Sequence, residues 1–291
     1  QAFTRGNSGP HSLRQRSLIL NQAMKSLLEM KGVVKDFPGA RALDGVDFTL
    51  APGEFHSLIG ENGAGKSTLM KILSGVYPAG SFNGEVKVNG SPCRFQSVTD
   101  SASAGIAIIF QELSLIDELS VAENIFLGRE PSRFGVVDWN ELRRAAKKVI
   151  DLIGLNVDVT AKVSSLGLGQ KQLVEIAKAL SQDAHILVLD EPTAALNDSE
   201  AEKLFSILGE LKNRGVGLIY ISHRLEEVFR FSDRITVLRD GRTVGSFGRG
   251  ELDETKAIEL MVGREIAAKF PLRNTSLGAV ALEVKNLNVW N

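Results

Sequence analysis

Apolar residues follow two different patterns along the chain. Over 27–50 and again over 85–90, short segments with a period of two are separated by turn sequences such as Asn89-Gly90. This is typical of short strands in an antiparallel layer. From Gln170 onward, short apolar runs alternate with segments of helical spacing. That alternation predicts a parallel sheet covered by helices.

The middle of the chain is expected to be helical. Ser120 is placed to cap a helix that starts with Val-Ala-Glu-Asn, and Asp138 or Asn140 is placed to cap another helix whose apolar residues fall on one face. The pattern predicts a helical insert over about 112–165. The chain as a whole is therefore predicted to have an α/β fold with an antiparallel β layer and this insert.

A glycine-rich loop lies between a predicted strand at 54–59 and a predicted helix at 68–74. Its sequence over 60–67, Gly-Glu-Asn-Gly-Ala-Gly-Lys-Ser, fits the phosphate-binding pattern G-x-x-x-x-G-K-[ST]. The glycines allow backbone N–H groups to surround phosphate oxygens, Lys66 adds positive charge for the β and γ phosphates, and the Ser67 hydroxyl is placed to bind Mg²⁺. The alternative is a glycine-rich turn with a solvated lysine. The residues predicted to contact a nucleoside triphosphate are Gly60, Glu61, Asn62, Gly63, Ala64, Gly65, Lys66, Ser67 and Thr68.

Three other strands are predicted to end in polar residues at the same edge of the sheet. One apolar run ends in Asp190 and Glu191. Asp190 is predicted to bind Mg²⁺, and Glu191 is predicted to accept the proton of an attacking water. Gln111 and His223 each end a further apolar run. Taken alone, each of these residues also fits a purely structural role. The predicted catalytic residues are Glu191, His223, Gln111 and Lys66, and the predicted Mg²⁺ ligands are Ser67, Gln111 and Asp190.

A second glycine-containing turn precedes the predicted helix at 171–180. The N-terminus of a helix favours anions, so this turn is a second candidate phosphate site. One bound nucleotide needs only one phosphate-binding loop, so this second turn is more than a single site requires. The turn consists of Leu166, Gly167, Leu168, Gly169 and Gln170.

The ordered set GENGAGKS, Gln111, LGLGQ, LVLDEP and ISH resembles the ATP-binding-cassette ATPases, over about 27–263. The resemblance implies a P-loop NTPase fold, with a RecA-like core, an antiparallel β subdomain and a helical subdomain. It also implies that ATP and Mg²⁺ are bound and that two cassettes pair head to tail, so that the turn at 166–170 binds the ATP of the opposite cassette. Phe37 matches an aromatic residue that stacks on adenine, and a core aromatic before Pro38 is the alternative.

Several stretches resemble the sugar-importing branch with two cassettes in one polypeptide, among them F-P-G-A-R-A-L-D-G-V and M-V-G-R-E. This implies a peripheral protein on the cytoplasmic face of the inner membrane. Its partners would be a second cassette, in the same chain or as a homodimer, a membrane permease and, indirectly, a periplasmic sugar-binding protein. Residues 75–85 and 166–180 most resemble xylose importers, while ribose, galactose and other monosaccharides stay open.

The chain departs from the family pattern at two positions. Gly167 stands where a serine usually contacts the γ-phosphate across the interface, and Asn197 stands where an aspartate is common. Both departures bear on how strongly two cassettes are coupled.

Composition narrows the possible partners. The chain has 291 residues, 43% of them hydrophobic, and a formal net charge of −1, which suits a globular protein and gives no general basic surface for nucleic acid. The single Cys93 excludes an intramolecular disulfide or a cysteine metal cluster. No run of 18 apolar residues is present that could span a bilayer.

The two ends of the chain differ from the rest. Residues 1–23 contain three arginines and no Asp or Glu, and are interpreted as a leader ahead of a start at Met24, a disordered tail or a transit peptide. The first cassette is placed at 24–263 and a linker at 264–280. Because Leu282-Glu-Val-Lys-Asn-Leu287 repeats the pattern at 28–33, 281–291 is predicted to begin a second cassette.

Two rival functions are kept open. One is a soluble tandem-cassette ATPase that acts on ribosomes or nucleic acid, although the short segment 264–281 with Pro271 is unlike the long charged linker usual in such proteins. The other is an ATP-binding fragment without turnover.

Overall fold

The computed structural model describes residues 26–110, 113–194, 196–264, 282, 283 and 285. At its centre is a six-stranded sheet with the order β12-β11-β3-β10-β9-β6. All neighbours are parallel except the β11–β12 hairpin. The strands are β3 (Phe55–Ile59), β6 (Ile106–Ile109), β9 (Ile186–Asp190), β10 (Gly217–Ile221), β11 (Arg234–Arg239) and β12 (Arg242–Gly248).

A second, antiparallel sheet has the order β2-β1-β4-β5. The turn at Asn89 and Gly90 joins its last two strands, as the sequence predicts, and both residues have positive φ, which suits Asn-Gly. The strands are β1 (Leu28–Phe37), β2 (Ala40–Leu50), β4 (Asn83–Val88) and β5 (Ser91–Cys93).

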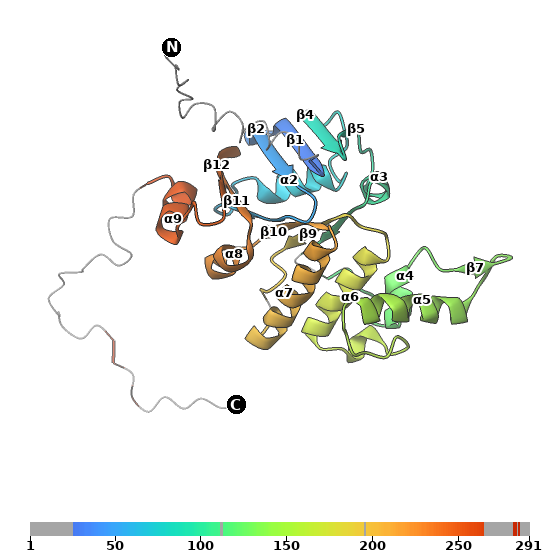
Figure 1. The fold of residues 1–291 in the computed structure, drawn as a ribbon. Coiled ribbons are helices and arrows are strands. Elements are labelled where there is room, and N and C mark those ends of the chain that lie inside the picture. Colours follow the sequence, from blue (N-terminus) through green and yellow to red (C-terminus); the bar gives the residue numbers. More distant parts are fainter. Residues whose placement is uncertain (1–25, 111–112, 195, 265–281, 284, 286–291) are drawn as a thin grey trace, which may run out of the picture.

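The helices cover the central sheet unevenly (Figure 1). Helix α2 (Lys66–Leu73) lies between the two sheets, and α6 (Leu168–Leu180) and α7 (Asp198–Asn213) lie on the other face with α4 (Val121–Phe126) and α5 (Trp139–Leu152) beyond them. The remaining elements are α3 (Val98–Ser103), the short β7 (Ser132–Arg133) and β8 (Val136–Val137), the 3₁₀ turn η1 (Val163–Ser165), α8 (Leu225–Phe231) and α9 (Glu254–Val262).

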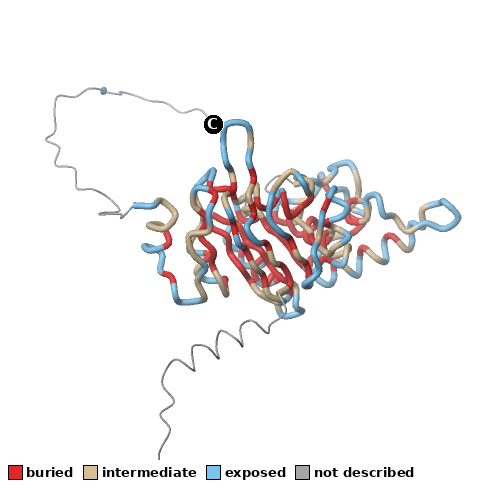
Figure 2. The backbone as a smooth tube through the Cα atoms, turned by 90° about the horizontal axis from the view of Figure 1, so that it is seen from above, coloured by how far each residue is buried: buried red, intermediate tan, exposed pale blue. Residues whose placement is uncertain are grey.

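The core is divided by the central sheet. Leu187 and Leu189 of β9 face α6 and α7, whereas Ile186 and Val188 of the same strand face α2 and the antiparallel sheet. Both sets are fully buried, and Figure 2 shows the buried residues concentrated along the central strands. Burial on both faces explains why β9 has a continuous apolar sequence.

The fold class predicted from the sequence is confirmed, with the antiparallel layer and the helical segments where the patterns put them. The helices at α3 and α9 and the β7–β8 hairpin were not predicted. In the described ranges, none of the helices is long and apolar enough to cross a membrane. The predicted leader at 1–23 and nearly all of the predicted linker and second-cassette strand lie outside the described residues.

Candidate functional site

A small pocket forms where the carboxyl ends of the parallel strands meet. Its volume is about 240 Å³. The glycine loop after β3 supplies one wall, and the residues that end β9 supply the other. Its lining residues are Asn62, Gly63, Gly65, Lys66, Ser67, Thr68, Asp190 and Glu191. The structure therefore brings the two main predicted sequence motifs together, although about 120 residues separate them in the chain.

The glycines of the loop are required for two different reasons. Gly65 precedes α2 with φ 103°, and Gly63 has φ 85°, values that side chains other than glycine rarely adopt. A Cβ atom at Gly60 would lie 2.2 Å from the carbonyl oxygen of Leu238, so glycine is needed there for space. Strand β11 is thus in direct contact with the loop and helps to fix its shape.

Lys66 is the first residue of α2, and its amine contacts the loop. Its Nζ donates hydrogen bonds to the carbonyl oxygens of Gly60 at 2.7 Å and Glu61 at 3.0 Å. Burial lowers the pKa of Lys66, while the charges of Asp190 and Glu191 act in the opposite direction. The amine is thus placed at the pocket together with two carboxylates.

Asp190, the last residue of β9, is partly buried and lies near the charges of Glu191 and Lys66. Burial raises the pKa of Asp190, the neighbouring Glu191 charge adds to that effect, and Lys66 opposes it. Ser67 and Asp190 both line the pocket. In the described ranges, no group of three or more His, Cys, Asp and Glu side chains is placed to hold a metal ion. The Ser67 hydroxyl and the Asp190 carboxylate suit Mg²⁺ that arrives with a nucleotide, because such ions take only one or two protein ligands and complete their shell with phosphate oxygens and water.

Glu191 has an unusual backbone conformation, with φ 50°. Non-glycine residues in this region are uncommon and cluster at functional sites. Its N–H donates to the carbonyl oxygen of Ile221 at 2.8 Å, which ties it to the end of β10. Its Oε2 atom lies 3.0 Å from Nδ1 of His223. The predicted base and the predicted histidine are therefore in direct contact.

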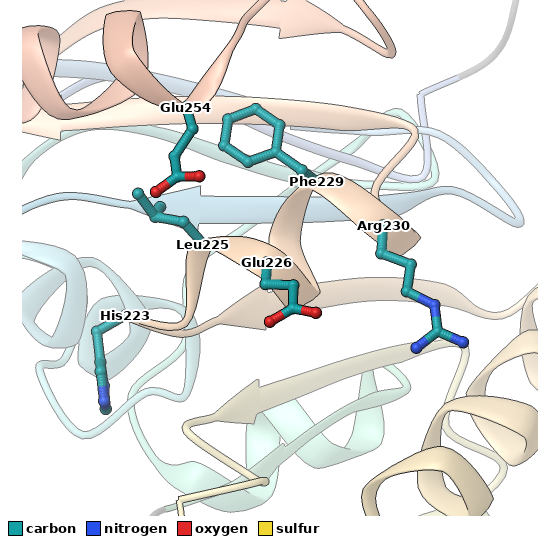
Figure 3. A pocket seen from close by; sticks show the side chains of 6 residues that line it. All are labelled: His223, Leu225, Glu226, Phe229, Arg230 and Glu254. Carbon is teal, nitrogen blue, oxygen red and sulfur yellow. The ribbon is translucent and has the colours of Figure 1, made fainter. Parts of the chain in front are cut away.

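His223 is 68% exposed and also borders a second, larger pocket. This pocket has a volume of about 780 Å³ and lies beside α8 and α9 (Figure 3). It is lined by His223, Leu225, Glu226, Phe229, Arg230 and Glu254.

The second glycine turn lies at the N-terminus of α6. Gly167 is the N-cap residue, and its N–H donates to Gln170 Oε1 at 3.1 Å. A Cβ atom there would meet nothing closer than 3.9 Å, so no steric reason requires glycine in place of serine. Leu168 is 45% exposed. Among the described residues that line the phosphate-loop pocket, none comes from 166–170.

Asn197, the other departure from the family pattern, caps α7. Its Oδ1 accepts the Glu200 N–H at 3.0 Å, and Glu200 Oε2 accepts the Asn197 N–H at 3.1 Å. This reciprocal pair is a capping box. Asn197 thus has a structural role within its own cassette.

Phe37 ends β1 beside a second aromatic ring. It makes an edge contact with Tyr77 at 5.5 Å, and Nζ of the buried Lys35 lies 5.1 Å from the Phe37 ring. The ring is half-buried and does not line the phosphate-loop pocket. Both interpretations of Phe37 stay open. Gln111 lies outside the described residues.

A buried polar cluster, not predicted from the sequence, adjoins the loops that carry Glu191 and His223. It consists of Thr193, Tyr220, Ser222 and Glu227. The only sequence signal is proximity, since Thr193 follows Glu191 closely and Ser222 precedes His223. Glu227 has no such signal because helix packing brings it into place.

The family model described as ABC transporter matches residues 43–194. This range contains the phosphate loop, the second glycine turn and Glu191. The chain belongs to the ABC transporter family. The predicted resemblance is therefore confirmed, and the α/β architecture described above is that of the family's ATP-binding cassette.

Curated relatives cover most of the chain. "Xylose import ATP-binding protein XylG" of Moorella thermoacetica is 56% identical over 265 residues, 91% of this chain and 53% of its own length. "Ribose import ATP-binding protein RbsA 1" of Rubrobacter xylanophilus is 52% identical over 91% of this chain and 52% of its own. The chain spans about half the length of the curated relatives it matches.

A solved ATP-binding cassette of an ABC transporter, in its ADP conformation, has a similar fold. Its TM-score is 0.71 at 28% sequence identity, and the match covers 82% of this chain and 99% of that one.

Proposed function

We propose that this chain is an ATP-hydrolysing cassette whose active site is the phosphate-loop pocket. The observation that carries the proposal is the contact of 3.0 Å between Glu191 Oε2 and His223 Nδ1 beside that pocket. A carboxylate that is oriented by a second group is what a general base for water attack requires. The substrate is MgATP.

The roles of the other residues follow from their positions. The loop N–H groups and the Lys66 amine bind the phosphates, since both lie at the N-terminus of α2. Ser67 and Asp190 hold Mg²⁺, directly or through water. Glu191 accepts the proton of the attacking water, and His223 orients Glu191. Gln111 is proposed to contact Mg²⁺ or that water, and Phe37 to stack on adenine.

A complete site is proposed to need two cassettes. The described lining of the pocket contains no residue of 166–170, whereas the exposed Gly167 and Leu168 lie on the outside of the cassette. The turn would then cover the ATP of an opposite cassette, either in the same polypeptide or in a second copy.

Sugar import is proposed as the process that hydrolysis drives. The relatives named for xylose and ribose import support this, and the higher identity to the xylose protein favours xylose. The cassette would sit peripherally on the cytoplasmic face of the inner membrane, against a permease that receives sugar from a periplasmic binding protein.

Substitutions at Lys66 and Glu191 test the proposed active site. Lys66→Ala is expected to abolish measurable ATP binding, because it removes a charge that faces the phosphates. Glu191→Gln should keep ATP affinity within about twofold and lower turnover at least about 100-fold, since only the base is lost. Binding is followed by fluorescent-nucleotide titration and turnover by phosphate release.

Lys71→Ala is the matched control, because Lys71 is an exposed lysine of the same helix α2. It should leave both measurements unchanged. Turnover in Glu191→Gln equal to that of the unchanged protein would overturn the assignment of the base.

The transported sugar is tested by uptake. Vesicles that contain the full-length protein with its permease and sugar-binding protein should take up labelled xylose when ATP is inside. Unlabelled xylose should compete better than ribose. Preferential uptake of ribose would contradict the xylose assignment and leave the ATPase assignment standing.

A further inference from the structure

Glu227, in the first turn of α8, is the centre of a buried polar cluster. Its Oε2 atom accepts hydrogen bonds from the hydroxyls of Tyr220 at 2.6 Å, Thr193 at 2.9 Å and Ser222 at 3.4 Å. Its Oε1 atom pairs with Arg224 Nη1 at 2.6 Å. Both carboxylate oxygens are thus satisfied, although Glu227 is only 8% exposed.

These partners come from the two segments that carry the proposed base and its histidine. Thr193 follows Glu191 on the loop after β9, while Ser222 and Arg224 flank His223 on the loop after β10. Glu227 therefore links the two loops from the interior. It bonds to side chains that lie one or two residues along the chain from Glu191 and His223.

The energetics favour a role in fixing positions. A buried carboxylate is unfavourable unless it is fully hydrogen-bonded and paired, and a satisfied buried ion pair adds little net stability compared with apolar side chains of the same shape. Burial and the Glu227 carboxylate both raise the pKa of Tyr220, so its hydroxyl stays a donor to this carboxylate. Because three hydroxyls from two chain segments bond to one oxygen of Glu227, the cluster connects both loops.

We propose that Glu227 is a positioning residue for ATP hydrolysis, which holds the loops of Glu191 and His223 so that these two side chains stay in contact. The inference rests on the proposed ATPase function. Glu227 itself does not line the phosphate-loop pocket in the described structure, so its effect on turnover is indirect.

The first test removes the charge of Glu227 and keeps its shape. In Glu227→Gln the amide oxygen can still accept from the hydroxyls, but the NH₂ group faces Arg224, so the loop of His223 is released. In the full-length protein, kcat for ATP should fall by about 10- to 100-fold, the range expected for small misplacements of a catalytic group. The affinity for ATP should change by less than about twofold, because the phosphate loop is untouched.

Glu226→Gln is the matched control. Glu226 is the preceding residue on the same turn, but it is exposed and borders the open pocket with His223 (Figure 3). It removes the same charge from the same helix end without touching the cluster, so kcat should stay unchanged. An equal fall of kcat in both variants would overturn the proposal.

A second pair of variants separates positioning from stability. Thr193→Val and Tyr220→Phe each remove one hydroxyl bonded to Glu227 Oε2. Only Thr193 lies on the loop of Glu191. Thr193→Val should therefore lower kcat about 10-fold, whereas Tyr220→Phe should lower the melting temperature and leave kcat nearly unchanged. If both variants lower only the melting temperature, Glu227 is merely structural.

A spectroscopic measurement gives a result that does not depend on turnover. The ¹⁵N shift of His223 Nδ1, which reports its contact with Glu191, should move in Glu227→Gln and Thr193→Val but not in Glu226→Gln. An unmoved shift in the first two variants overturns the inference. Equal turnover in Glu191→Gln and the unchanged protein would instead remove the proposed ATPase site, and would do so whatever the His223 shift shows.

Discussion

His56 shows how a residue with no sequence signal becomes important in the folded chain. It lies on β3, directly before the phosphate loop, and is stacked on Phe48 at 4.4 Å. Nδ1 lies 2.8 Å from the Thr49 carbonyl oxygen and Nε2 lies 2.7 Å from the Thr236 hydroxyl. Nδ1–H is placed to donate to the Thr49 carbonyl oxygen, and the Thr236 hydroxyl beside Nε2 also donates to the Ser246 hydroxyl at 2.9 Å. Burial lowers the pKa of His56 to about 3.

The pH dependence of stability follows from this residue. His56 binds a proton below about pH 6.5 in the unfolded chain but only near pH 3 in the folded one. The contribution of the neutral His56 to the free energy of unfolding is therefore fully present above pH 6.5, and it is lost as the pH falls from 6.5 towards 3. Between pH 7.5 and 5, His56 should lower the free energy of unfolding by about 2 kcal/mol.

Urea denaturation at the two pH values measures this change. In His56→Gln, whose side chain can still donate and accept hydrogen bonds, the difference in the free energy of unfolding between pH 7.5 and pH 5 should be smaller by about 2 kcal/mol. His185→Gln is the control, since His185 is exposed. A pH dependence that is unchanged in His56→Gln would contradict the neutral buried ring.

At the scale of elements, α6 and α7 meet through the second glycine turn. A Cβ atom at Gly169 would lie 2.6 Å from Glu200 Oε1, and Glu200 is the residue that completes the capping box with Asn197. At Gly167 the nearest atom to the added Cβ would be Gln170 Oε1 at 3.9 Å, an ordinary contact distance. Two glycines in one motif thus have different structural requirements.

Serine at each position tests that difference. Gly167→Ser should leave the free energy of unfolding within about 0.5 kcal/mol, because serine is a good N-cap residue and has room. Gly169→Ser should lower it by about 1 kcal/mol, because Glu200 must leave the α7 cap. Urea denaturation at pH 7.5 measures both. A larger loss at Gly167 than at Gly169 would contradict this account.

The sequence predicted most elements because their patterns are periodic. The apolar run predicted to end at His223 forms β10, and Asp138 caps α5 as expected through bonds to the N–H groups of Asn140 and Glu141. The missed β7–β8 hairpin has two-residue strands and places Phe134, 95% exposed, at its tip. It has no apolar face, so no periodicity could reveal it. Helix α3 did have a signal, the capping box of Ser97 and Asp100.

At the scale of the whole molecule, the phosphate loop is enclosed by parts of the chain that are far apart in sequence. The Gly241 N–H donates to the Ala64 carbonyl oxygen at 3.1 Å, and the Asp44 N–H donates to Gly241 at 2.7 Å. Arg242 pairs with Asp44 across the same junction. The antiparallel sheet and the β11–β12 hairpin therefore hold the loop on one side, and its other side faces the pocket.

A site completed by a second copy should depend on concentration. The ATPase rate per molecule of this chain is expected to rise with protein concentration, because two cassettes must meet to cover the nucleotide. A rate per molecule that is constant across concentrations would contradict pairing, and no turnover at any concentration would indicate a binding fragment.

Mixing two inactive variants sharpens this test. Lys66→Ala keeps an intact turn at 166–170, and Leu168→Arg, at an exposed position, keeps an intact phosphate loop. Each alone should be nearly inactive, and an equimolar mixture should regain part of the activity. A mixture as inactive as its components would contradict a site shared between two copies.

The family, the α/β architecture and the residues of the phosphate loop can be predicted from the amino-acid order, because they depend on local spacing: the period of apolar residues and the order of glycine, lysine and serine along a few residues. The contacts between distant side chains follow from the folded arrangement alone. The Glu191–His223 contact, the neutral His56 and the cluster around Glu227 join strands and helices distant in the chain. Burial and the parallel order of the sheet, which no local pattern records, bring them together.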